Sequence, residues 1–193
     1  MKLQKLVLLS LGIVATGISN LTFPVEKVAA SNVTGNTSFG DFNGDGKTDA
    51  FKADGSKWYV SYGMDGHWKQ LKISKHRLDN LGLGDFNGDG KTDVFRGDGD
   101  AWYISQSGTG RWKQINTSAY RVGSLGFGDF NGDGKTDVFR SDGGKWYISQ
   151  SGIGRWKQIN KSAYRIGSLK FADLNKDGKT DVYRTDGVDY SHA

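Results

Sequence analysis

The chain has 193 residues and a formal net charge of +5, with 26 Lys and Arg residues interspersed among 21 Asp and Glu residues. No run of basic residues suggests nucleic-acid binding. The chain has no cysteine, so an exported form would have to be stabilised without disulfides, and no thiol nucleophile is available.

Residues 1–30 are typical of a secretory signal peptide. Lys2 and Lys5 form a basic start, residues 6–18 are a mostly apolar run, and Val28-Ala29-Ala30 is a small-residue exit. The apolar run is short for a membrane span. We therefore expect a secreted, extracellular mature chain over residues 31–193, with no membrane span after cleavage. A retained N-terminal anchor is the alternative.

From Ser38 onward the sequence is periodic. The motif Asp-x-Asn-x-Asp-Gly-Lys-Thr-Asp begins at Asp41, Asp85, Asp129 and Asp173, which are 44 residues apart. A fixed period of this length indicates a repeat architecture. We place the repeats near residues 36–82, 83–126 and 127–170, with a partial repeat at 171–193.

Each motif gathers three carboxylates and one amide oxygen within nine residues. Two like charges 4 Å apart repel by about 1 kcal/mol in water and by several-fold more near a protein surface. A hard cation that accepts oxygen ligands in flexible geometry would relieve this repulsion, which favours calcium. The alternative is that Asn-Gly and Asp-Gly only form hairpin turns. That alternative explains the glycines but not the Asp residues at positions 1, 5 and 9.

The motif matches the first half of an EF-hand loop, with oxygen ligands at positions 1, 3 and 5, glycine at 6 and a backbone carbonyl at 7. Position 12 carries Lys or Arg where an EF-hand has Glu, so we expect the Asp at position 9 to close the site. The expected ligands of up to four Ca²⁺ ions, with Lys contributing its carbonyl, are Asp41, Asn43, Asp45, Lys47, Asp49, Asp85, Asn87, Asp89, Lys91, Asp93, Asp129, Asn131, Asp133, Lys135, Asp137, Asp173, Asn175, Asp177, Lys179 and Asp181.

The third repeat predicts four short strands separated by glycine turns, at residues 124–129, 137–140, 145–149 and 155–160. Such a unit fits one blade of a β-propeller. The fold class is therefore all-β, with about three and a half tandem antiparallel blades forming an incomplete ring. Adjacent apolar residues such as Val138 and Phe139 indicate sheets buried on both faces. We expect the recurring Trp58, Trp102 and Trp146 in the inter-blade core, with sugar binding as the alternative.

Phe127-Gly128 followed by Asp129-Phe130-Asn131-Gly132-Asp133-Gly134 resembles the FG-GAP, or VCBS, repeat of integrin α-subunit propellers and many secreted bacterial proteins. The resemblance covers about residues 36–187. It implies that the loop Asp and Asn side chains bind calcium between the first two strands of each blade. The Gly-Ala-Pro element is absent, which weakens the analogy to integrin ligand binding. The blades rich in Trp and Tyr are also similar to those of some fungal propeller lectins.

The sequence offers no set of catalytic residues, because its three histidines do not recur with the repeat. Arg96-Gly97-Asp98 spells an adhesion tripeptide, but its counterparts differ, and we interpret it as a turn. We predict a secreted, calcium-binding, non-catalytic module for adhesion or recognition. Its partner would be a cell-surface or matrix protein or a glycan, and open blade faces could form a homo-oligomer. The alternatives are a sugar-binding propeller lectin and an accessory domain of a secreted enzyme.

Overall fold

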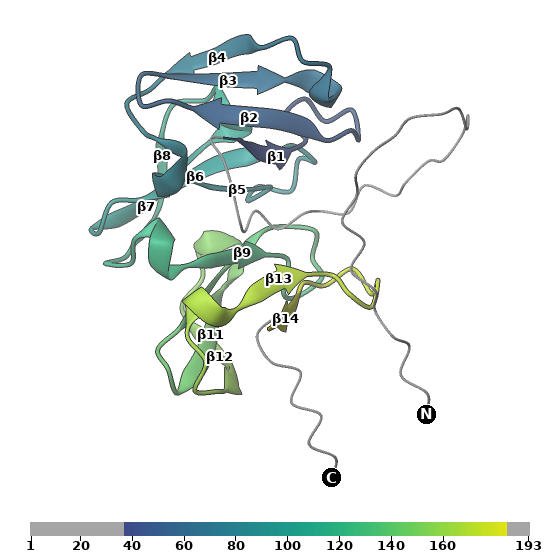
Figure 1. The fold of residues 1–193 in the computed structure, drawn as a ribbon. Coiled ribbons are helices and arrows are strands. Elements are labelled where there is room, and N and C mark those ends of the chain that lie inside the picture. Colours follow the sequence, from purple (N-terminus) through teal and green to yellow (C-terminus); the bar gives the residue numbers. More distant parts are fainter. Residues whose placement is uncertain (1–36, 185–193) are drawn as a thin grey trace.

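The computed structural model describes residues 37–184 (Figure 1). The expected signal peptide and residues 185–193 of the partial fourth repeat lie outside the described residues. Within the described part, the chain forms three four-stranded antiparallel sheets and one two-stranded sheet. The sequence prediction of tandem propeller blades followed by a half blade is confirmed.

Each complete blade uses four strands in sequence order, with hydrogen bonds between neighbours. Blade 1 contains β1 (Ser38–Gly40), β2 (Asp49–Ala53), β3 (Lys57–Ser61) and β4 (Lys69–Ile73). Blade 2 contains β5 (Gly82–Gly84), β6 (Asp93–Gly97), β7 (Ala101–Ser105) and β8 (Lys113–Thr117). Blade 3 contains β9 (Gly126–Gly128), β10 (Asp137–Ser141), β11 (Lys145–Ser149) and β12 (Lys157–Lys161). The half blade contains β13 (Lys170–Ala172) and β14 (Asp181–Tyr183).

Short 3-10 turns connect these strands. One kind follows the third strand of each blade: η1 (Tyr62–Met64), η3 (Gln106–Gly108) and η5 (Gln150–Gly152). The other kind precedes the first strand of the next blade: η2 (Leu78–Asn80), η4 (Val122–Ser124) and η6 (Ile166–Ser168). No helix in the part of the chain that the structure describes is long and apolar enough to cross a membrane.

The blades are arranged in chain order along an open arc, with β1–β4 at one end and β13–β14 at the other (Figure 1). The first strands of consecutive blades contact one another, so that β1 lies against β5, β5 against β9, and β9 against β13. This places the Asp-rich loops, which follow these first strands, beside one another in sequence order.

The expected bounds of the first, second and fourth strands of blade 3 differ from the structure by one or two residues. The first strand of blade 3 is only Gly126–Gly128, because Ser124 belongs to the turn η4. The fourth strand starts at Lys157, two residues later than predicted. The Trp156 ring lies edge-on against Trp102 of the preceding blade, with ring centroids 5.5 Å apart. That contact directs residue 156 toward the neighbouring blade before the strand begins.

The hydrophobic core lies between blades, which confirms the prediction that both sheet faces are buried. Trp58 and Trp102 are fully buried, and each is covered edge-on by the indole of Trp112 or Trp156 from the next blade, at 5.6 Å and 5.5 Å. Trp68 occupies the corresponding position in blade 1, where the described residues include no preceding blade, and it is 37% exposed. The aromatic repeat is thus mainly an inter-blade packing device.

Exposed large hydrophobic side chains are concentrated in the end blades. Blade 2, flanked on both sides, has none among those with the greatest exposure. The others belong to blade 1 or to blade 3 and the half blade: Phe39, Met64, Trp68, Ile73, Ile153, Ile159, Tyr164 and Leu174. The first blade and the last blades therefore expose the kinds of residue that the interfaces between blades bury.

The inter-blade core predicts different costs for two Trp→Ala substitutions at different positions of the repeat. Trp102→Ala removes a fully buried indole and should lower the free energy of unfolding by about 3–5 kcal/mol. Trp68→Ala removes a partly exposed indole and should cost about 1 kcal/mol. Urea unfolding followed by tryptophan fluorescence measures both values. Equal losses would contradict the assignment of these aromatics to interfaces between blades.

Candidate metal-binding loops

The Asp-rich loop of blade 2 is folded around the side chain of its first residue, Asp85. The backbone N–H groups of Gly88 and Gly90 donate hydrogen bonds to the two carboxylate oxygens of Asp85, at 2.7 Å and 2.9 Å. The N–H of Asp89 donates to Asn87 Oδ1 at 2.8 Å, and the N–H of Lys91 donates to Asp89 Oδ1 at 2.9 Å. Gly88 and Gly90 have φ angles of 79° and 81°, which favour glycine. Local side-chain acceptors therefore order this exposed turn.

The other three loops repeat this arrangement. The first residue of each accepts hydrogen bonds from the N–H groups at positions 4 and 6, the third accepts from position 5, and the fifth accepts from position 7. In the fourth loop Lys176 replaces the glycine at position 4 and still adopts a φ of 63°. The loop conformation thus persists where the sequence has drifted.

The Asp at position 9 links its loop to the end of the third strand. Asp93 accepts hydrogen bonds from the N–H groups of Phe86, at 3.2 Å, and Ser107, at 2.9 Å. Asp49 and Asp137 make the equivalent pairs, and all three carboxylates are fully buried. Among residues 37–184, the one hydrogen bond to the Asp181 carboxylate of the half blade comes from the N–H of Leu174, at 3.0 Å. Position 9 therefore has a structural role in addition to the expected metal-binding one.

Burial makes the anionic form of these position 9 residues unfavourable. The pKa of both Asp93 and Asp137 is raised to about 6: burial is the main cause, the neighbouring carboxylates at positions 5 and 1 add to it, and backbone N–H groups oppose it. Burial likewise raises the pKa of Asp49. At the exposed position 5, the hydrogen bond from Lys47 N–H lowers the pKa of Asp45. The loops thus contain carboxylates that repel one another, and a cation would stabilise the charged forms.

The oxygen atoms that each loop offers as metal ligands suit a hard cation. Each loop offers carboxylate, amide and carbonyl oxygens, the ligands that calcium prefers. A carboxylate has about four acceptor sites, so the N–H bonds orient these side chains without using all of them. Among residues 37–184, however, no three Asp, Glu or His side chains are grouped as ligands of one metal ion. Completing a calcium shell would require these side chains to turn toward one another.

Consecutive loops are joined by a contact that the sequence analysis missed. The N–H of Thr92, at position 8 of the second loop, donates to the carbonyl of Asp41 in the first loop at 2.6 Å. Thr136 and Thr180 make the same bond, also at 2.6 Å, to Asp85 and Asp129. We call these three contacts the loop clasps. The sequence contains a sign of this contact, because Thr recurs at position 8 in all four motifs. A single motif, however, does not indicate that this Thr lies against the preceding repeat.

Each loop clasp requires a glycine immediately before the Asp that accepts its hydrogen bond, which is Asp41, Asp85 or Asp129. A Cβ added to Gly40 would lie 2.5 Å from Thr92 Oγ1, and one added to Gly128 would lie 2.6 Å from Thr180. Gly84 is equally crowded by Thr136. The Lys at position 7 also reaches back, since the side chain of Lys91 lies over Gly44 of the preceding loop. Only glycine leaves enough space for this close approach.

The adhesion-like tripeptide forms part of a hairpin, as predicted. Gly97 ends β6, and Asp98 Oδ1 accepts hydrogen bonds from the N–H groups of Asp100 and Ala101. Arg96 Nη1 lies 3.0 Å from Asp98 Oδ2 in an ion pair. The Arg and Asp side chains are therefore bonded to each other.

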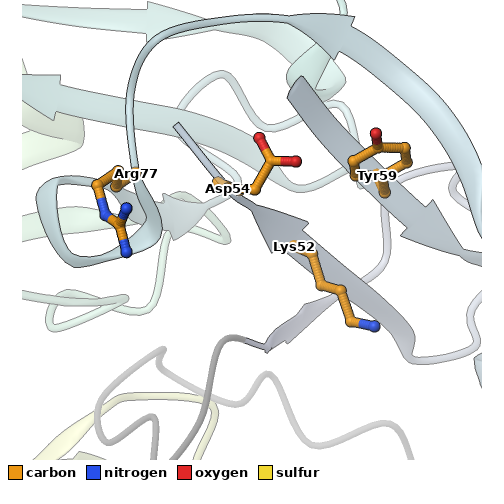
Figure 2. Close-up of a pocket in the computed structure, with 5 residues that line it drawn as sticks. Lys52, Asp54, Tyr59 and Arg77 are labelled. Carbon is orange, nitrogen blue, oxygen red and sulfur yellow. The ribbon is translucent and has the colours of Figure 1, made fainter. Parts of the chain in front are cut away.

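A small pocket lies at the same repeat positions in blade 1. Figure 2 shows that Lys52, Asp54 and Tyr59 come from β2, the following turn and β3, whereas Arg77 comes from the segment before η2. The pocket has a volume of about 270 Å³ and is completed by Ala53. Lys52 and Asp54 correspond to Arg96 and Asp98 of blade 2.

These blades and loops define a repeat protein of the propeller class. The family model of the FG-GAP-like repeat matches three times, at residues 41–95, 85–140 and 129–183. The chain therefore belongs to the FG-GAP-like repeat family. The comparison with curated proteins gives no match.

Two solved structures share the fold. A lectin from Agrocybe aegerita, described as recognising non-reducing terminal N-acetylglucosamine, aligns with a TM-score of 0.57 and 17% identity, over 81% of this chain and 47% of the lectin. A mutant Tc holotoxin pore from Photorhabdus luminescens aligns with a TM-score of 0.53 and 12% identity, over 78% of this chain and 8% of the toxin. The chain thus spans about half the length of the lectin.

The loop clasps predict that Gly84→Ala destabilises the protein, because the added methyl group would clash with Thr136. Overpacking of this kind costs about 1–3 kcal/mol. Gly123→Ala is the matched control, since a Cβ at Gly123 meets no atom within 4 Å, and it should change stability by less than about 0.5 kcal/mol. Chemical denaturation measures both. Equal stability of the two variants would show that the loops are not in close contact.

Proposed function

We propose that the protein is a secreted, non-catalytic recognition module whose Asp-rich loops bind calcium for structural purposes. The observation that carries the proposal is the same loop conformation in all four repeats, each organised around oxygen donors suited to calcium. The clustered carboxylates give a reason for a cation. Membership of a repeat family with an extended surface is consistent with recognition.

Calcium would supply positive charge among the carboxylates at positions 1, 5 and 9. Asp85, Asn87, Asp89, Asp93 and the Lys91 carbonyl would hold it in blade 2, and their counterparts would do so elsewhere. Each loop clasp joins one Asp-rich loop to the preceding one. Calcium that orders one loop would therefore also stabilise the loop next to it. The site would therefore stabilise the arc without taking part in any reaction.

The partner would be a glycan or protein of a cell surface or matrix. The exposed apolar side chains of blade 1, blade 3 and the half blade also suit association with a second copy of the chain, because the interfaces between blades bury residues of the same kind. The sugar-binding alternative is favoured by a groove between blades 1 and 2 that is lined by charged and aromatic side chains, among them Lys75, Arg96 and Trp112.

Calcium should raise the melting temperature of the protein after EDTA treatment. A ligand at 100 times its Kd stabilises by about 2.7 kcal/mol per site, which corresponds to an increase of about 5–10 °C for a chain of this size. Differential scanning calorimetry measures the shift, and native mass spectrometry gives both the number of bound ions and the assembly state. An unchanged melting temperature without bound calcium would contradict the proposal.

A matched pair of variants locates the effect. Asp45→Asn/Asp89→Asn/Asp133→Asn keeps an acceptor for each local N–H but removes three loop charges, so it should reduce the calcium-dependent shift more than the stability in EDTA. Asp79→Asn/Asp100→Asn removes two charges outside the loops and should leave the shift intact. Loss of the shift in both variants would indicate an unspecific charge effect.

The same proposal predicts opposite pH dependences with and without calcium. Without metal, the raised pKa values of Asp93 and Asp137 contribute stability below the ordinary value of 3.8, and this contribution is lost as pH rises through about 6. With calcium, protonation competes with the metal, so the calcium-dependent shift should grow as pH rises from 5 to 7. Calorimetry with and without EDTA at these pH values measures both trends. A calcium-dependent shift that is equal at pH 5 and pH 7 would contradict coordination by these two residues.

A further inference from the structure

A groove lies between blades 1 and 2, on the side formed by the last strand of blade 1. It has a volume of about 620 Å³. We call it the basic groove, and its lining residues are Lys72, Ile73, Ser74, Lys75, His76, Arg96, Asp98 and Trp112. The first five come from β4 and the segment after it, and the others come from blade 2. The groove therefore exists only when consecutive blades are packed together.

Arg96 is held in the basic groove by two aromatic rings. Its guanidinium carbon lies 4.0 Å from the ring centre of Tyr103 and 5.0 Å from that of Trp112. The one hydrogen bond to the protein is the Nη1 bond to Asp98, and the buried Nε has no partner among the described residues. A guanidinium has five N–H donors. Arg96 can therefore donate further hydrogen bonds, and few acceptors line the groove.

Positive charge predominates in the basic groove. Lys75 is exposed and His76 is partly buried, whereas Asp98 is the single carboxylate of the lining. The Lys72 ammonium donates to Ser105 Oγ and the Gly110 carbonyl across the interface. Burial lowers the pKa of His76, and the nearby Arg96 and Lys75 charges lower it further. An anion bound here would therefore meet a favourable potential.

The interface between blades 2 and 3 provides an internal comparison. The same two-ring contact of an Arg is present there, because the Arg140 guanidinium lies 4.1 Å from the centre of the Tyr147 ring and 5.0 Å from that of the Trp156 ring. The basic residues of the first interface are replaced there, since Asn116, Ala119 and Tyr120 occupy the positions of Lys72, Lys75 and His76. Asn116 Nδ2 donates to the Gly152 carbonyl at 2.9 Å, a neutral substitute for the Lys72 bonds. The two interfaces thus share a scaffold and differ in charge.

We propose that the basic groove binds a saccharide that carries a negative charge, either a carboxylate, as in a uronic acid, or a phosphate. This inference rests on the proposed recognition function. Arg96 and Lys75 would pair with the anionic group, and the Trp112 and His76 rings would contact the apolar face of the sugar ring. A groove that is polar, open and partly aromatic suits a hydroxyl-rich ligand better than an apolar one. Each chain would hold one such site, because the second interface lacks the extra cations.

The test exchanges the charged residues of one interface for those of the other. Lys75→Ala/His76→Tyr gives the first interface the residues that the second already accommodates. Ala119→Lys/Tyr120→His makes the reverse change. Titration calorimetry in calcium and about 150 mM salt compares each variant with the native chain. The probes are a galacturonate trimer, glucose 6-phosphate, a neutral galactose trimer and inorganic phosphate, so that the two anionic groups are tested separately.

The native chain should bind at least one of the two charged sugars at a single site, in preference to the neutral trimer. The first variant should bind that sugar at least about tenfold more weakly, because hydrogen bonds to charged groups are lost. The reverse variant should bind two molecules per chain. Melting temperatures close to that of the native chain would show that the interfaces are retained.

Three results would overturn the inference. Equal binding of charged and neutral trimers would leave a recognition function without the charge preference. Inorganic phosphate bound as tightly as the sugars would reduce the groove to a simple anion site. Binding of no probe would reject the groove as a saccharide site. None of these results affects the calcium-dependent melting shift, so failure here is distinguishable from failure of the calcium proposal.

Discussion

The structure depends on the close approach of consecutive Asp-rich loops. The N–H of Thr92 reaches the carbonyl of Asp41 at 2.6 Å, and the same bond recurs twice along the chain. This approach is possible because the residue before Asp41, Asp85 and Asp129 is glycine, which has no side chain. The next blade therefore begins at a defined distance from the previous one. The aromatic contacts between blades, such as Trp58 with Trp112, depend on that spacing.

The same approach creates an electrostatic difficulty. Each loop carries three carboxylates, and the clasps bring successive loops together. Backbone N–H groups relieve part of the repulsion, as at Asp85, while burial makes the anionic forms of Asp93 and Asp137 less favourable. A structural cation at each loop is the simplest way for a chain without cysteine to turn this cluster into a stabilising feature. Calcium and the clasps would then act on the same segment.

The repeat period and the adjacent apolar residues within the strands were sufficient to predict the blades. Val94 and Phe95, adjacent in β6 and both fully buried, required a sheet covered on both faces. Other features depend on contacts between repeats, which a single repeat does not specify. The contact of Thr136 with the preceding loop, the link from Asp137 to the turn after β11, and the basic groove all join segments far apart in sequence. Trp156 illustrates the limit, because its packing on Trp102 shortens the predicted strand.

Hydrogen exchange of the position 8 threonine amides, followed by NMR, tests the loop clasps most directly. Thr92, Thr136 and Thr180 donate to the preceding loop, whereas Thr48 has no such bond among the described residues. We expect the first three amides to exchange at least about 100-fold more slowly than Thr48, a ratio that corresponds to about 2.7 kcal/mol of local opening free energy. Similar exchange rates for all four amides would contradict the account of loops clasped in sequence along the arc.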